Sequence, residues 1–399
     1  MFFHDILEAQ PDPIFGLNEA FHADVRPNKV DLIIGIYKDL ELHAKLMPSV
    51  MKAKSLAIPQ DLQADYLPLD GLPDFCEQIG MLIFGEKSWK ENHSRIYSAQ
   101  TIGGTGALQV GGQFLSQEIS KSIAVSSPTW PNHRSIFERA GCKVDTYAYY
   151  CREKHAIEFD VLSDSLKKLP EKSVVLLHTV CHNPTGCDLS LEQWKEMSRI
   201  IRSKNLLPFF DFAYHGLGEG LEKDRQAIEI FVQDGHEMLV AYSCAKNFSL
   251  YCQRVGALFA VSENAAVKLR IGSQIKKIIR SLYSNPPAHG VRIATALLHD
   301  PVLKEEWKKE LVTMRHRVAV IRESFVERLS KKSKKVDFGF LRSHKGMFSF
   351  MDLDKSQVQQ LIQRFGIYLL DNGRISLTGL NEKNIDYVVD GVAEVCDGK

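Results

Sequence analysis

The chain has 399 residues, of which 44% are hydrophobic and 25% are charged, and its formal net charge is +1. Such a composition supports a sizeable core, and a net charge near zero argues against attraction to nucleic acid or to a membrane surface. No apolar run approaches the roughly 20 residues that cross a bilayer, and the acid-containing N-terminus lacks the apolar stretch of a signal peptide. The eight cysteines form no CxxC pair, so we expect free thiols in a reducing compartment and a cytoplasmic location.

Short β-forming runs alternate with helical stretches through the middle of the chain. Strands are predicted at residues 122–128, 143–150, 173–180, 206–214 and 238–243. The run at 173–180 is continuously apolar, as a strand covered on both faces should be. Residues 189–205 carry the apolar periodicity of an amphipathic helix. This alternation predicts an α/β fold with a mainly parallel sheet and helices on both of its faces.

The last third of the chain has a different pattern. Residues 301–332 predict a long charged amphipathic helix. Two short segments, 346–353 and 367–380, follow with a helix near 355–365 between them and a final helix after them. This arrangement predicts a second, smaller α+β domain.

Polar side chains follow the predicted strands. In an α/β sheet, ligands gather at the carboxyl ends of the strands. The residues at these positions are Thr129, Trp130 and His133, then His182 and Asn183, then Asp211 and Tyr214, and then Ser243, Lys246 and Arg254. Upstream, the stretch TIGGTGALQ places glycines at the start of a predicted helix, where free backbone N–H groups form an anion site. The spacing of Cys181, His182 and Cys187 matches no known ligand set, so we predict no metal.

These residue types suit one cofactor. A phosphate cradle is offered by Gly104, Thr105, Gly106, Ser243 and Arg254. Trp130 is able to stack on a flat ring, Asp211 to face a ring nitrogen, and Asn183 and Tyr214 to donate to an aromatic oxygen. Lys246 supplies the amine for an imine, which pyridoxal phosphate requires. Each group alone also has a structural explanation: core packing for Trp130, a cap or ion pair for Asp211, and surface exposure for Lys246. Their joint placement favours the cofactor.

Eight segments of the chain then resemble one family. They are YLPLDGLPDF (66–75), GGTGAL (103–108), SPTWPNHRSIFERAG (127–141), HNPTG (182–186), DFAYHGL (211–217), AKNFSLYCQRVG (245–256), YSNPPAHG (283–290) and GMFSF (346–350). Together and in this order they closely resemble the fold-type I aminotransferases, and most of all the class-I aspartate and aromatic amino acid aminotransferases. The resemblance covers essentially the whole chain. It implies an N-terminal arm at 1–12, a small domain from 13–44 and 314–399, and a large pyridoxal-phosphate-binding domain at 45–313.

The resemblance assigns the cofactor residues. It makes Lys246 the Schiff-base lysine, and Asp211 the acid that keeps the ring nitrogen protonated. Tyr214 and Asn183 would bond the phenolic oxygen, and Trp130 would stack on the ring. The phosphate would be held by Gly104, Thr105, Gly106, Ser243 and Arg254, with Tyr66 from the neighbouring subunit. His133 and His178 would support Asp211, or would be ordinary core histidines.

The resemblance also assigns the substrate residues. Arg374, in NGRISLTG, would bind the α-carboxylate together with Asn183 and the backbone at Gly35. Arg280, in KKIIRSLYSNPP, would bind the distal carboxylate from the partner subunit of a homodimer, or else would be an ordinary helix-surface arginine. The implied substrates are aspartate and glutamate with their 2-oxo acids, in a ping-pong reaction that uses the Lys246 amine as the base.

Three departures from the family pattern bear on the substrate. Residues 38–48 lack the usual glycine, Cys244 and Ala245 replace an aromatic residue and a serine, and Leu282 replaces a polar residue. The added apolar character would suit aromatic amino acids. Three alternatives stay open: a decarboxylase or β-lyase with the same cofactor, a non-enzymatic cofactor-binding regulator, and a nicotinamide dehydrogenase built on the GGTGALQ turn.

Overall fold

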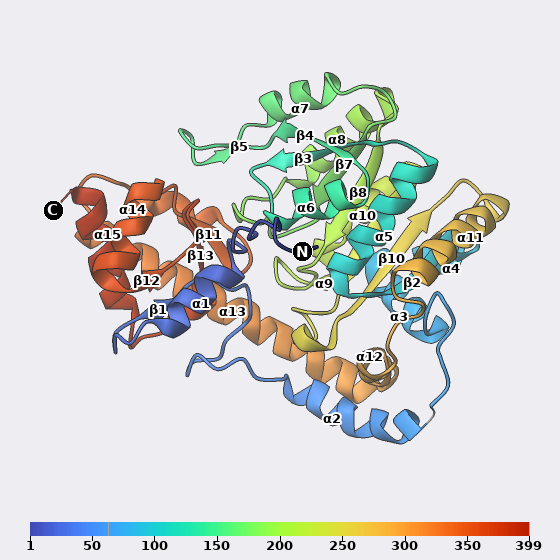
Figure 1. Cartoon of the computed structure of the whole chain (residues 1–399), viewed down its shortest axis with the longest axis horizontal. Coiled ribbons are helices and arrows are strands. Elements are labelled where there is room, and N and C mark those ends of the chain that lie inside the picture. Colours follow the sequence, from blue (N-terminus) through green and yellow to red (C-terminus); the bar gives the residue numbers. More distant parts are fainter. Residues whose placement is uncertain (63, 399) are drawn as a thin grey trace.

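A seven-stranded sheet forms the centre of the computed structural model, which describes residues 1–62 and 64–398 (Figure 1). Its strands are β2 (Ile96–Ile102), β3 (Ser122–Ser127), β4 (Lys143–Ala148), β7 (Val174–His178), β8 (Leu207–Phe212), β9 (Met238–Ser243) and β10 (Val255–Val261). They lie in the order β2-β10-β9-β8-β7-β3-β4. Only β10 runs antiparallel to its neighbours, and the other pairs are parallel. The mainly parallel sheet and its five predicted strands are confirmed.

Helices cover both faces of this sheet, as predicted. Val175 and Leu177 of β7 pack with α3 (Pro73–Phe84), α8 (Leu191–Ser203) and α10 (Gln226–Gln233). Val174 and Leu176 point the other way and pack with α5 (Gly103–Glu118), α6 (Asn132–Arg139) and α11 (Ala265–Leu282). All four side chains are buried, and burying each one stabilises the fold by roughly 2 kcal/mol. The continuous apolar run therefore serves both faces of the sheet.

The amphipathic helix predicted at 189–205 is α8. Ser190 begins it with a capping box: the Ser190 hydroxyl accepts from the Gln193 backbone at 3.2 Å, and the Gln193 side chain accepts from the Ser190 backbone at 2.8 Å. The helix predicted from its apolar periodicity is confirmed, and the capping box fixes where it begins.

A second apolar cluster lies away from the sheet. The long helix predicted at 301–332 is α13 (Pro301–Lys332), which Asp300 caps at its N-terminus. The side chains of α13 up to Met314 pack with the large core, whereas those from Val318 onward pack with β12 (Ile367–Tyr368), β13 (Arg374–Ser376) and α15 (Ile385–Asp397). β11 (Phe348–Phe350) pairs with β13. This change supports a smaller α+β unit, and the limits drawn at 13–44 and 314–399 stay a prediction.

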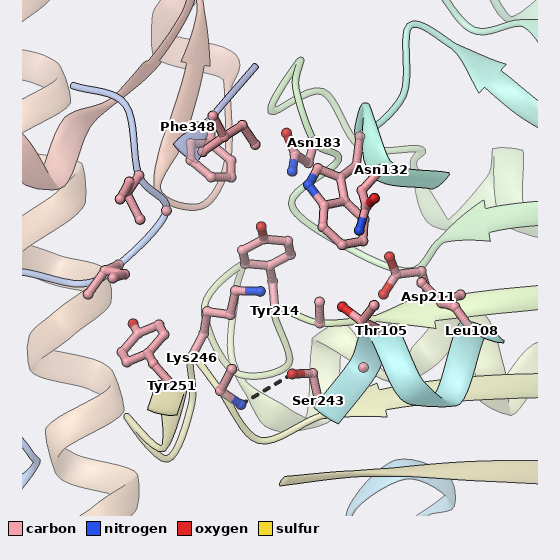
Figure 2. Close-up of a pocket in the computed structure, with 18 of the residues that line it drawn as sticks. Thr105, Leu108, Asn132, Asn183, Asp211, Tyr214, Ser243, Lys246, Tyr251 and Phe348 are labelled. Carbon is pink, nitrogen blue, oxygen red and sulfur yellow. Dashed lines mark hydrogen bonds between the residues drawn. The ribbon is translucent and has the colours of Figure 1, made fainter. Parts of the chain in front are cut away.

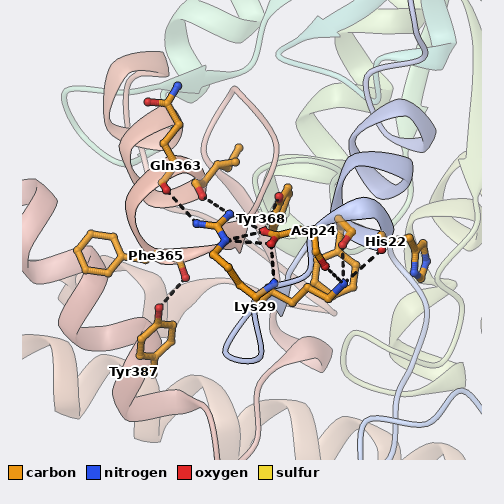
Figure 3. Close-up of polar contacts among 10 residues, drawn as sticks. His22, Asp24, Lys29, Gln363, Phe365, Tyr368 and Tyr387 are labelled. Atoms are coloured by element: carbon orange, nitrogen blue, oxygen red, sulfur yellow. Dashed lines mark hydrogen bonds and ion pairs between the residues drawn. The ribbon is translucent and has the colours of Figure 1, made fainter.

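The N-terminal part of the chain is joined to this smaller unit. β1 (Val30–Asp31) pairs in parallel with β12 (Ile367–Tyr368). Arg26 Nε donates to the Asp24 carboxylate at 2.7 Å and Tyr368 donates to it at 2.8 Å (Figure 3). The hydrogen bonds from Arg26 hold the pKa of Asp24 well below its usual value. These contacts fix the segment that leads to Gly35.

The remaining elements complete the two units. They are α1 (Phe15–Ala23), α2 (Pro48–Ala57), α4 (Glu86–Asn92), β5 (Tyr150–Cys151), β6 (Ala156–Ile157), α7 (Phe159–Lys167), α9 (Leu221–Asp224), α12 (His289–His299) and α14 (Lys355–Gln360). The helix expected near 355–365 is α14 followed by a π-helical turn, Leu361–Phe365. Among the described residues, no helix has both the length and the apolar character needed to cross a membrane.

Candidate functional site

One cavity of about 560 Å³ opens where β8 and β9 end, and it brings most of the predicted site residues together (Figure 2). The predicted residues that line it are Gly35, Gly104, Thr105, Trp130, His178, Asn183, Asp211, Tyr214, Ser243, Lys246, Arg254 and Arg374. Four predicted residues lie outside its described lining: Gly106, His133, Tyr66 and Arg280. The carboxyl ends of the strands therefore form the site, as expected for this sheet.

The turn from β2 into α5 forms the anion-binding end of the cavity. No side chain caps the N-terminus of α5, so its first backbone N–H groups stay available. A Cβ atom at Gly103, where φ is +69°, would lie 2.5 Å from an Arg254 guanidinium nitrogen, and one at Gly104 would lie 2.9 Å from Ser243 Cβ. The two glycines therefore let Arg254 and Ser243 approach the turn, which gives a cradle suited to a phosphate.

Asp211 lies at the end of β8 with a histidine against it. His133 Nε2 is 3.0 Å from Asp211 Oδ2, and His133 Nδ1 is 2.8 Å from the Thr129 hydroxyl. Burial of Asp211 would raise its pKa, but the hydrogen bond to His133 and the nearby charges outweigh burial and lower it. Asp211 is therefore an ionised, fixed carboxylate at the cavity wall.

His178 contributes differently from His133. Its ring centre is 5.1 Å from that of His133, and its Nδ1 accepts from the Asn183 backbone N–H at 3.1 Å. Burial lowers the pKa of His178 to about 3, so the ring is neutral. His133 thus contacts Asp211 directly, while His178 orients the Asn183 segment.

Lys246 follows β9 and reaches into the same cavity. Its amine lies 4.8 Å from the centre of the Tyr214 ring, and Figure 2 shows it directed toward that ring. Burial lowers the pKa of Lys246 to about 8, Asp211 opposes the shift, and Arg254 and Arg374 add to it. A large share of this amine is therefore unprotonated at mildly alkaline pH, unlike an ordinary surface lysine.

Arg374, in β13, forms the opposite end of the cavity. It is 2% exposed, and its guanidinium lies 4.0 Å from the centre of the Phe348 ring. It donates to Asn183 Oδ1 at 3.2 Å and to the Ile33 carbonyl, while its Nε has no partner among the described residues. Burial lowers its pKa to about 10, so it stays charged at neutral pH. A buried cation with a free donor suits a carboxylate ligand.

Sequence reasoning did not assign several lining residues. They are Ile14, Phe15, Ile34, Ile36, Leu108, Asn132, Val180, Ala213, Tyr251, Cys252 and Phe348. Tyr251 accepts a hydrogen bond from the Tyr37 backbone at 2.8 Å. Its place between Lys246 and Arg254 in the sequence was a usable signal. Ile14 and Phe15 offered none, because they come from a part of the chain far from every motif.

The three departures fall at different depths. Ala245 lines the cavity and Cys244 is fully buried behind it. Ile34, Gly35 and Ile36 line the cavity, whereas residues 38–48 do not appear in its described lining. Leu282 is 41% exposed and also lies outside the described lining. Only the departure at Cys244 and Ala245 therefore changes the wall of this chain's own cavity.

Comparison with known proteins identifies the family. Residues 27–392 match the family described as aminotransferase class I and II. The chain belongs to this family. It is 42% identical to the aspartate aminotransferase of Escherichia coli (strain K12) over 98% of this chain and 100% of that protein. The predicted family, fold type and enzyme class are confirmed.

Solved structures agree with this assignment. The aromatic-amino-acid aminotransferase of Burkholderia pseudomallei, covalently bound to pyridoxal phosphate, superimposes with a TM-score of 0.95 at 38% identity over 99% of each chain. The aspartate aminotransferase of Saccharomyces cerevisiae cytoplasm also has a TM-score of 0.95, at 36% identity over 99% of this chain and 98% of that one. Class I aminotransferases depend on pyridoxal phosphate. The cavity fits this cofactor, because its amine, its fixed carboxylate and its phosphate cradle are all present.

Proposed function

We propose that this aminotransferase moves amino groups between aspartate or glutamate and 2-oxo acids, with aromatic amino acids as further donors. The observation that carries the proposal is that Lys246 and the buried Arg374 open on one cavity with the Asp211 carboxylate in its wall. A base and a carboxylate receptor in one cavity are what an α-amino acid needs in order to lose its α-proton.

Bound pyridoxal phosphate supplies an aldehyde carbon and an electron-withdrawing ring. The α5 N-terminus, Ser243 and Arg254 would hold the phosphate, Trp130 would stack on the ring, and Asn183 would help to fix it. Asp211 would face the ring nitrogen, where its lowered pKa keeps a negative charge. Tyr214 would donate to the phenolic oxygen.

Side chains of the protein bind the amino donor and transfer its proton. Arg374 binds the α-carboxylate and orients the α-carbon toward Lys246. The Nζ of Lys246, with its pKa near 8, takes up the α-proton and later returns a proton. Because one set of groups serves donor and acceptor in turn, the first product leaves before the second substrate enters. The kinetics are therefore ping-pong.

The site is shared between two chains of a homodimer. Tyr66 and Arg280 are both exposed and lie outside the described lining of their own chain's cavity. They serve the neighbouring chain, Tyr66 at the phosphate and Arg280 at the distal carboxylate. The arm at residues 1–12 exposes Met1, Phe2, Phe3 and Leu7, which a second chain would cover. All eight cysteines are free, which supports a cytoplasmic location.

Aromatic amino acids are the preferred donors in a second candidate function. The supporting observation is the apolar wall formed by Phe15, Ile34, Ile36 and Phe348. A panel of amino-acid donors with 2-oxoglutarate as acceptor, scored by kcat/KM, separates the two functions. The proposal expects aspartate and glutamate to lead the panel. Aromatic leaders would favour the second function. Release of CO₂, or release of ammonia without transfer of the amino group to 2-oxoglutarate, would indicate a decarboxylase or a β-lyase.

A further inference from the structure

The two segments that carry Tyr66 and Arg280 are tied to each other within one chain. Lys276 Nζ, one turn before Arg280 in α11, lies 2.9 Å from the Asp70 carboxylate. Beyond the end of α11, the Asn285 side chain donates to the Leu67 carbonyl at 3.3 Å. The segment that follows Tyr66 is therefore bound to the chain on both sides of Arg280.

A buried glutamine joins both segments to the sheet. Gln100 of β2 is 1% exposed. Its backbone N–H donates to the Asp70 carbonyl at 2.9 Å, and its side chain accepts from the Leu72 N–H at 3.1 Å and donates to the Pro287 carbonyl at 2.7 Å. Gly71, with φ at +84°, allows this approach, because a Cβ atom there would lie 2.3 Å from Gln100 Cβ. Gln100 thus fixes the two segments in one geometry.

The side chains of Tyr66 and Arg280 are exposed and make none of the contacts of this junction, by which we mean Gln100 and the Asp70–Lys276 pair. Tyr66 is 92% exposed. Arg280 is exposed and donates to the Ser284 hydroxyl, one turn along its own segment. The chain next to each residue is therefore tied to the junction, while the two side chains remain available to another molecule.

We propose that Gln100 and the Asp70–Lys276 pair are positioning residues that present Tyr66 and Arg280, as one unit, to the active site of the partner subunit. This inference rests on the proposed function, in which Arg280 reads the distal carboxylate. A bidentate contact between guanidinium and carboxylate demands an accurate placement, and a fixed backbone lowers the cost of ordering a long side chain. The junction therefore sets the affinity for dicarboxylic ligands and leaves aromatic ligands little affected.

Lys276→Met tests the surface part of the junction, because the Lys276 side chain is 44% exposed and its loss leaves the core intact. Lys277→Met, an exposed neighbour on the same helix, is the matched control, and Lys276→Arg retains the ion pair. Two measurements on the holoenzyme are needed: the dissociation constants of maleate and of 3-phenylpropionate, and the single-turnover half-reactions of aspartate and of phenylalanine. We expect Lys276→Met to weaken maleate binding and to lower kcat/KM for aspartate about threefold to fivefold. Both aromatic ligands, the control variant and Lys276→Arg should stay at the wild-type values.

Gln100→Leu tests the buried part of the junction. Because this substitution removes two side-chain hydrogen bonds, we expect kcat/KM for aspartate to fall about tenfold or more and kcat/KM for phenylalanine to change little. Equal losses for both ligand classes in Lys276→Met, or no loss in either, would overturn the inference whatever the outcome for Gln100→Leu.

Mixed dimers show whether the effect crosses between subunits. In one mixed dimer, a Lys246→Ala/Lys276→Met chain is paired with a wild-type chain. Its one working site receives Arg280 from the altered chain, so kcat/KM should fall for aspartate and not for phenylalanine. When a Lys246→Ala chain is paired with a Lys276→Met chain, the working site receives Arg280 from an unaltered chain and should behave as wild type. The reverse pattern would overturn the inference. A wild-type enzyme that reacts with neither donor would instead overturn the proposed function.

Discussion

Replacing Arg374 by lysine keeps a positive charge at the end of the cavity but removes the planar pair of donors. Arg374 is 2% exposed and is fixed by Asn183, the Ile33 carbonyl and the Phe348 ring. A shorter, flexible ammonium cannot reproduce the two-point contact with an α-carboxylate. A hydrogen bond to a charged group is worth about 1.5–3 kcal/mol, so losing one should lower kcat/KM about tenfold to hundredfold.

Every donor carries an α-carboxylate, so the loss in Arg374→Lys should be similar for aspartate, glutamate and phenylalanine. The assay is the kcat/KM of each donor, with circular dichroism and thermal unfolding as the check that the variant is folded. Arg280→Ala is the matched contrast, and it should hurt aspartate far more than phenylalanine. A loss below about twofold in Arg374→Lys, or a loss confined to dicarboxylic donors, would refute the assignment of Arg374.

Three further outcomes follow from the charges in the structure. In the cofactor-free protein, the rate at which an acylating reagent labels Lys246 should rise with pH about a midpoint near 8, and a midpoint above 10 would contradict its burial between cations. Asp211→Asn should lower kcat about a hundredfold or more without unfolding the protein, and near-normal activity would remove Asp211 from the site. Burial of His344 lowers its pKa to about 3, so the unfolded chain binds more protons as pH falls below 6.5 and stability is lost toward pH 3. Between pH 7.5 and 5, urea unfolding of His344→Phe should therefore lose about 2 kcal/mol less than wild type, and equal losses would show that His344 does not contribute.

The sequence predicted the parallel strands because their pattern is local. The buried runs that became β7 and β9 are continuous and apolar, and each is followed by the polar residues of the site. The sequence did not identify β2 or β10 as strands. β10 is equally buried, but it begins at the end of the motif that holds Lys246 and Arg254, and its antiparallel pairing depends on contacts with β2 that no local pattern encodes.

Site residues also divide into those that the local sequence predicts and those that depend on tertiary contacts. Asp211, Ser243 and Lys246 could be chosen from their positions after strands, whereas Arg374 came only from the family resemblance. Arg374 meets Asn183 across 191 positions in the chain, and a single arginine in a short strand carries no signal of that contact. Phe15 and Ile34 were missed for the same reason, since the pairing of β1 with β12 brings their segment to the cavity. The role of Gln100 also depends on tertiary contacts, because a polar residue inside a strand predicts nothing by itself.

The central claim is that the amine of Lys246 holds the cofactor in the cavity beside Asp211. Borohydride reduction of the pyridoxal-phosphate-loaded protein, followed by peptide mapping, tests it most directly. We predict one modified residue, Lys246, and no labelling in Lys246→Ala. Labelling at another lysine, or a protein that never forms the coloured adduct, would contradict the account.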